Sequence, residues 1–252
     1  MVRTGDGRKV RGMTHMHIPD GILPFWLWMG GYAVLAAVLA LCLFRLRGMD
    51  RRKKIPLLGA LSAVMLVAMS FEPLPPYHLN LSAVAGILLG PSLGFLAACI
   101  VNLMLALMGH GGITVMGLNT ILLGAEAVLG HTLFFLLPAR MPVFWRAAAA
   151  TVLALCVASL FLIVIVGVSH IEVSLVEEHH EHGPASVASL TSGKGSLLTF
   201  AVTVLIVGFF GWLIEGAITG AIIRFIAQVK PDLLAHVLHK ESCHPGASRC
   251  AP

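Results

Sequence analysis

The residues best suited to binding a metal ion lie just ahead of the first long apolar run, at Met16-His17-Ile18-Pro19-Asp20-Gly21. A Met-His dipeptide at a free chain start offers three nitrogen donors along one short stretch of backbone. They are the terminal amine, the deprotonated amide nitrogen of His17 and its imidazole. Planar nitrogen sets suit Ni(II) and Cu(II), and imidazole also suits Co and Zn. This chemistry requires Met16 to be the first residue, since an internal methionine has no amine to donate.

A fourth nitrogen is available from His78, which ends the stretch Phe71-Glu72-Pro73-Leu74-Pro75-Pro76-Tyr77-His78. The three prolines keep this loop extended and stiff, so an imidazole is presented with little loss of entropy. We expect His78 to complete a planar set with Met16 and His17. The alternative is an ordinary histidine in a surface loop.

Other polar residues are candidates for indirect roles. His110 lies in Gly109-His110-Gly111-Gly112, where the glycines permit a tight turn. We expect it to support the metal ligands or to line the entry path, with direct ligand and plain turn residue as alternatives. Asn102 and Asn119 lie inside apolar runs, where polar groups face the bundle interior and find partners. For them a supporting or entry-path role and a helix-packing role both stay open.

Ionisable residues inside the apolar runs are costly in lipid. We expect Glu126 and His131 to pair with each other or to line a path, and a helix-packing role is the alternative. For Glu215 the same choice between packing and function stays open. Farther along, Glu177-Glu178-His179-His180-Glu181-His182 is a tract of the kind that binds metals loosely. His179, His180 and His182 are therefore candidates for metal collection outside the specific site, and a solvated loop without function is the alternative.

The composition is that of a membrane protein. Of the 252 residues, 58% are hydrophobic and 12% are charged, against about 25% charged in soluble domains, and the mean hydropathy is +0.90. We predict an all-α polytopic protein with about seven transmembrane helices, in the cell (inner) membrane. The apolar segments are about 22–44, 55–70, 79–90, 92–108, 113–138, 147–170 and 197–228. The third and fourth meet at Gly90-Pro91-Ser92, a helix stop and restart, and six spans with one broken segment is the alternative count.

The distribution of basic residues sets the expected orientation. With seven spans, twelve Lys and Arg residues fall on one side, which the positive-inside rule makes the cytoplasm. The amino terminus is then outside, the carboxyl terminus is inside, and His17, His78, His110 and loop 170–195 share the outer face. The net charge of +5 is explained by this bias, and no nucleic-acid partner is expected.

Residues 1–15 are the exception to the rule, since they carry four basic residues on the outer side. A translation start at Met16 would remove these and Asp6, which lowers the net charge from +5 to +2. We therefore interpret 1–15 as an extension that is a mis-assigned start or a removed leader. Residues 16–234 form the membrane-embedded part and 235–252 a cytoplasmic Cys/His tail, whose spacing matches no closed zinc motif.

Two kinds of catalytic machinery are not encoded. No HExxH is present, which disfavours a membrane zinc protease. Gly193-Lys194 is no phosphate-binding loop, because position 188 is Ala and Gly195 stands where Ser or Thr is needed. We predict no catalytic residues and no permanent cofactor.

Several motifs together resemble one family. Met16-His17-Ile18-Pro19-Asp20-Gly21 resembles the start of the substrate-binding membrane subunit of cobalt and nickel energy-coupling-factor transporters, the CbiM/NikM type. The resemblance continues over most of residues 16–234, through these stretches: His78-Leu79, Ala85-Gly86-Ile87-Leu88-Leu89-Gly90-Pro91, Gly109-His110-Gly111-Gly112-Ile113-Thr114, Gly117-Leu118-Asn119-Thr120 and Glu215-Gly216-Ala217-Ile218-Thr219.

The resemblance implies a seven-helix bundle with an external amino terminus and a metal held by Met16, His17 and His78. It also implies partners: a transmembrane coupling subunit, cytoplasmic ATPases and often a small accessory membrane protein. The chain departs from the family in its fifteen extra residues, its His-rich loop and its Cys/His tail. The function expected is capture of Ni(II) or Co(II) at the outer face for ATP-driven uptake. A self-sufficient metal permease and a non-transporting membrane metal sensor or enzyme are the alternatives.

Overall fold

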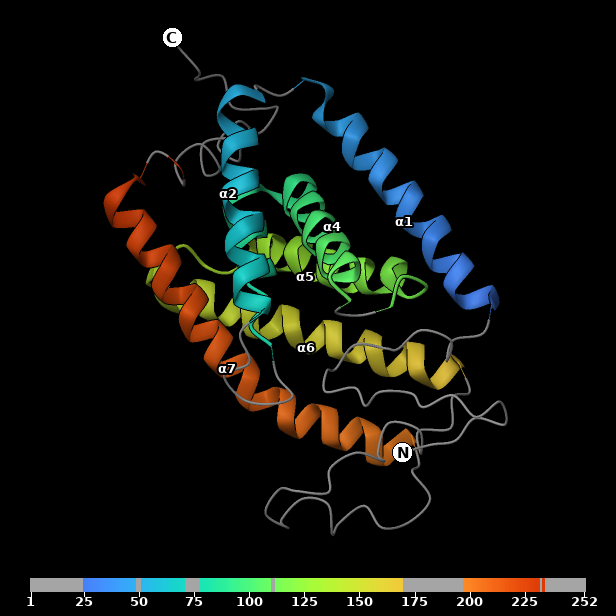
Figure 1. Ribbon diagram of the computed structural model, residues 1–252. Coiled ribbons are helices and arrows are strands. Elements are labelled where there is room, and N and C mark those ends of the chain that lie inside the picture. The colour runs from blue at the N-terminus through green and yellow to red at the C-terminus, as the bar shows by residue number, and fades with distance from the viewer. Residues whose placement is uncertain are drawn as a thin grey trace, which may run out of the picture.

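The computed structural model describes residues 25–48, 51–70, 78–109, 112–169, 197–231 and 233. Over these ranges it is all helical, with no strand (Figure 1). The helices are α1 (Phe25–Arg45), a short 3-10 turn η1 (Leu46–Gly48), α2 (Arg51–Met69), α3 (Ser82–Leu89), α4 (Pro91–Leu107), α5 (Met116–Leu136), α6 (Val143–Ser169) and α7 (Leu197–Val229). Each of the seven predicted apolar segments forms a helix, with ends within four residues of those expected.

Four helices are long and apolar enough to cross a membrane within the described ranges: α1, α5, α6 and the part of α7 from Val204. α2 and α4 contribute shorter apolar stretches. α3 is different, because its eight residues rise only about 12 Å, against a hydrocarbon core of about 30 Å. The third predicted segment therefore cannot span a bilayer alone, and the number of crossings and their direction stay a prediction.

α3 and α4 form a tight helical hairpin. The predicted stop and restart is confirmed, since α3 ends at Leu89 and α4 begins at Pro91. Gly90 between them has φ 85° and ψ 170°, a conformation that side chains with a Cβ rarely adopt, and proline suits the first position of the new helix. A Cβ on Gly94 would lie 2.8 Å from the Cα of Gly86. Eight residues along one straight helix would be about 12 Å apart, so the chain reverses at Gly90.

The hairpin packs on α5 through backbone contact. All eight residues of α3 are buried. A Cβ on Gly86 would lie 1.9 Å from the carbonyl oxygen of Ala127 in α5, and one on Gly130 would lie 2.9 Å from the Cβ of Ala83. Small residues at helix contacts let backbones approach closely, as in other membrane bundles. This contact fixes where the start of α3 lies against α5.

The long helices enclose this centre. α6 and α7 pack along each other, and α5 lies against α6 (Figure 1). α1 reaches α5 through Gly31, which lies against Leu118, and the hydroxyl of Tyr32 donates to the carbonyl of Ile113. Large apolar side chains such as Phe44 on α1 and Val67 on α2 are exposed, which suits helices that face lipid.

Gly86→Ala is expected to destabilise the protein by about 1–3 kcal/mol, the usual cost of overpacking, because the new methyl group meets a backbone carbonyl. Thermal unfolding in detergent measures this. Gly59→Ala in α2 is the matched control: a Cβ there meets nothing within 4 Å. Equal unfolding temperatures for the two variants would contradict the contact between α3 and α5.

Candidate functional site

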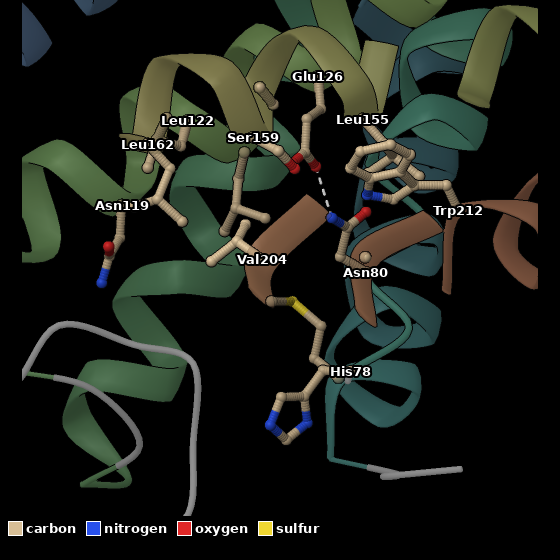
Figure 2. A pocket seen from close by; sticks show the side chains of 14 residues that line it. His78, Asn80, Asn119, Leu122, Glu126, Leu155, Ser159, Leu162, Val204 and Trp212 are labelled. Atoms are coloured by element: carbon tan, nitrogen blue, oxygen red, sulfur yellow. Dashed lines mark hydrogen bonds between the residues drawn. The ribbon is translucent and has the colours of Figure 1, made fainter. Parts of the chain in front are cut away.

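A cavity of about 140 Å³ lies between α2, α5, α6, α7 and the segment that leads into α3. It has room for several water-sized groups. Its wall is largely apolar, with contributions from Met69, Leu122, Leu123, Leu155, Ala158, Leu162, Val204, Gly208 and Trp212. Five polar side chains complete it: His78, Asn80, Asn119, Glu126 and Ser159 (Figure 2). An apolar pocket with a few converging polar groups is the usual form of a small-ligand site.

His78, the predicted fourth nitrogen donor, is one of the residues that line this cavity. It is half-buried and precedes α3 by four residues. In Figure 2 its imidazole points away from the hydrogen bond between Glu126 and Asn80. The structure thus places one predicted ligand in the wall of this cavity, with its ring directed away from the bond between Asn80 and Glu126.

Asn80 joins two structural elements through the two ends of its amide. Its Nδ2 donates to Oε2 of Glu126 at 2.5 Å, and its Oδ1 accepts the backbone N–H of Ser82 at 2.8 Å. The second bond is a turn in which the asparagine side chain accepts from the backbone two residues on, and it gives a partner to the first N–H of α3. The first connects the start of α3 to the middle of α5. Figure 2 shows the side chains of Glu126 and Asn80 directed at each other.

Glu215 holds the next residue of the same segment from α7. Its Oε1 accepts the backbone N–H of Leu81 at 3.1 Å, and its side chain is fully buried. Leu81 has φ 53° and ψ 20°, the left-handed region, which is rare for a residue other than glycine, Asn or Asp. Carboxylates near a helix N-terminus also meet the positive end of the helix dipole. Two buried acidic side chains therefore act on consecutive residues ahead of α3.

The two predicted asparagines have different surroundings. Asn119, in the first turn of α5, is buried and lines the cavity. Asn102 connects α4 to α5 instead: its Nδ2 donates to the carbonyl of Met116 at 3.0 Å and to Oγ1 of Thr120 at 2.7 Å. Since these two acceptors flank Asn119 in α5, Asn102 fixes the turn that carries it. Of the two roles left open for Asn102, helix packing is the one that these contacts match.

Pairing between Glu126 and His131 was one of the two expectations for these residues, and it is wrong. Glu126 bonds to Asn80, whereas Nδ1 of His131 lies 3.1 Å from the carbonyl oxygen of Gly86 and its ring packs on Phe135. Five residues apart on a helix, two side chains point about 140° away from each other. Of the pair, Glu126 alone lines the cavity.

The other predicted site residues lie outside the described ranges: Met16, His17, His110, His179, His180 and His182. Among the described residues there is no group of three or more His, Cys, Asp or Glu side chains that could hold a metal ion. The sequence analysis did not single out Asn80, Ser159 or Trp212. An asparagine ahead of a helix often bonds to the backbone two residues on, but the bond of Asn80 to Glu126, 46 residues away, leaves no local signal.

Known proteins resemble this chain over most of its length. The model of the CbiM family, described as "Cobalt uptake substrate-specific transmembrane region", matches residues 17–233. A protein of Haloquadratum walsbyi, provisionally named a metal transport protein, is 32% identical over 248 residues, covering 87% of this chain and 93% of its own length. A protein of Archaeoglobus fulgidus, provisionally named the fused nickel transport protein NikMN, is 29% identical over 227 residues, covering 87% and 68%.

The fold also has a solved counterpart. A crystal structure described as that of a transition metal transporter superposes with a TM-score of 0.68 and 19% sequence identity. The match covers 90% of this chain and 98% of that one. At this identity the likeness concerns the fold alone, and it extends over nearly the whole of both chains.

Asn102→Leu is expected to lower the stability of the protein by about 1–3 kcal/mol, because the carbonyl of Met116 and the hydroxyl of Thr120 lose a buried donor. Thermal unfolding in detergent measures the loss. Leu103→Ala, at the exposed neighbouring position, is the control and should stay within about 0.5 kcal/mol of the parent protein. An unchanged Asn102→Leu protein would contradict the packing role.

Proposed function

Because the chain belongs to the CbiM family of cobalt uptake substrate-specific transmembrane regions, we propose that it is the substrate-specific subunit of an energy-coupling-factor importer that captures Ni(II) or Co(II) at the outer face. The family and the four long apolar helices make it a multi-pass membrane protein and a membrane component of cobalt or nickel transport. The observation that carries the finer proposal is the position of His78 in the wall of the cavity, among four other polar side chains.

The proposed ligands are the amine of Met16, the amide nitrogen and imidazole of His17, and the imidazole of His78. One imidazole is an incomplete set for a transition metal, so His78 needs donors from elsewhere in the chain. A Met-His chain start supplies three nitrogens at once, and four nitrogens in a plane suit Ni(II), with Co(II) also accepted by imidazole. A mostly apolar wall with a few polar groups, as in this cavity, is the usual setting of such a site.

The donor role of Met16 depends on how the mature chain begins. The family match begins at His17, which is in keeping with a chain that starts at Met16 and with residues 1–15 as an extension. With Met1 in place, the nitrogen of Met16 is an ordinary amide. The proposal therefore includes a start, or a cleavage, that exposes the amine of Met16.

Release of the metal to the inside requires energy from partner proteins. The proposed partners are a transmembrane coupling subunit, cytoplasmic ATPase subunits and a small accessory membrane protein. The Archaeoglobus relative is named as a fused transport protein, which supports association with another transport component. The sequence itself carries no phosphate-binding loop at Gly193-Lys194.

Metal titration of two purified chains, full-length and starting at Met16, tests the ligand set. The chain starting at Met16 should bind Ni(II) or Co(II), and His17→Ala and His78→Ala should each lower the affinity by more than tenfold, since even indirect changes around a metal cost about 10–100-fold. Competition calorimetry in detergent measures the affinity. Chemical acetylation of the Met16 amine should lower it in the same way.

His131→Gln is the matched control for the titration, because this imidazole bonds to a backbone carbonyl and does not line the cavity. It should bind metal as the parent chain does. Equal affinity in a full-length chain whose Met1 is proved intact by N-terminal sequencing would show that the Met16 amine is not a ligand.

Uptake into vesicles tests the need for partners. The chain alone, reconstituted in lipid vesicles, should not accumulate radioactive nickel or cobalt, whereas the chain with its coupling subunit, ATPases and ATP should. The expected difference follows from the absence of an energy-supplying motif in this sequence. Accumulation by the chain alone down a metal gradient would instead identify a self-sufficient permease.

A further inference from the structure

We propose that Asn80 and Glu126 are positioning residues that fix the imidazole of His78 for the transported metal, with Glu215 holding the same segment from α7. The inference rests on the proposed function, because it requires a metal at His78. It adds a role for three polar residues that are not themselves ligands.

The first support is the position of the hydrogen bonds along the chain. Three bonds fall on the residues that follow His78 by two to four positions: Asn80 to Glu126 at 2.5 Å, Ser82 to Asn80 at 2.8 Å and Leu81 to Glu215 at 3.1 Å. Rotation of the backbone at Asn80 would swing His78, which is only two residues away. The orientation of the imidazole therefore depends on this cluster, which we call the α3 clamp (Asn80, Glu126 and Glu215).

The second support is burial. Asn80 is 8% exposed, Glu126 is 9% exposed and Glu215 is fully buried. A buried hydrogen-bonding group that loses its partner is costly. The clamp therefore holds one geometry firmly. Leu81 shows this directly, since a left-handed conformation persists where the surroundings over-determine it.

The third support is that starting α3 does not require the whole clamp. Oδ1 of Asn80 accepts the N–H of Ser82, the first residue of α3, without any contribution from Glu126. The bond to Glu126 adds a connection to α5 at the cost of taking a carboxyl group out of water. What the connection adds is orientation, and metal sites depend on ligands held to within about 0.5 Å by surrounding hydrogen bonds.

Two substitutions break the bond between Asn80 and Glu126 and leave the N–H of Ser82 with an acceptor. Asn80→Ser keeps a short side-chain acceptor for the N–H of Ser82 but cannot reach Glu126, and Glu126→Leu removes the same bond from the other side. Glu126→Gln keeps an acceptor oxygen for Asn80 and is the conservative rescue. Thr132→Val is the matched control, because this hydroxyl bonds to the carbonyl of Val128 on the exposed side of α5 and does not line the cavity.

The experiment measures Ni(II) affinity and the Ni(II) absorption spectrum of whichever chain above, full-length or starting at Met16, binds the metal. Asn80→Ser and Glu126→Leu should each bind Ni(II) 10–100-fold more weakly. Their d–d band should move to lower energy, as is also expected for His78→Ala, because a nitrogen donor is lost from the plane. Glu126→Gln and Thr132→Val should keep the parent affinity and spectrum.

A double-mutant comparison excludes a merely structural effect. If Asn80 acts through His78, Asn80→Ser should cost nothing further in a His78→Ala background. Loss of folded protein alone would lower the unfolding temperature and leave the spectrum of the folded complex unchanged.

The possible failures are distinct. Parent-like affinity and spectrum in Asn80→Ser and Glu126→Leu would overturn the positioning role and leave the proposed function standing. An equal loss from Asn80→Ser with and without His78 would also overturn it. Absence of Ni(II) and Co(II) binding by both parent chains would overturn the proposed function and this inference with it.

Discussion

The start of α3 must satisfy its backbone polar groups without water, because all eight residues of the helix are buried in the protein. The first N–H groups of any helix lack partners within the helix, and an unsatisfied buried group costs the free energy of its desolvation. Side chains from the preceding segment and from α7 supply the acceptors. This requirement explains why asparagine and glutamate occur at this point of a largely apolar interior.

Close packing makes that arrangement possible. α3 reaches α5 because Gly86 presents no side chain to the carbonyl of Ala127, and the hairpin closes because Gly90 adopts a positive φ. With these contacts fixed, Glu126 on α5 comes within hydrogen-bonding distance of Asn80. The cavity then lies beside the clamp, between α5, α6 and α7, with His78 at its wall. The site is thus a consequence of how one short helix is enclosed by long ones.

The sequence predicted most of the secondary structure, because a membrane imposes a strong and local rule. Apolar length predicts helices, and proline after glycine predicts their interruption, so all seven segments and the break at Gly90-Pro91 were found. The contacts between helices could not be predicted in the same way. Glu126 and His131 are both polar and close in sequence, yet the helix turns them apart, and their partners lie on α3 and just ahead of it.

The sequence alone determined the helical membrane architecture and the resemblance to cobalt and nickel uptake subunits. It also determined the candidate donors Met16, His17 and His78. Hydropathy and motif spacing are local properties of the chain, so no tertiary structure was needed for these predictions. The tertiary structure alone decided that α3 is a short enclosed helix, that His78 lines a cavity, and that Asn80 joins Glu126. Asn80 and Glu126 are 46 positions apart in the chain, and Leu81 and its partner Glu215 are 134 positions apart. Only the packing of the helices brings such residues together, so no local pattern could encode them.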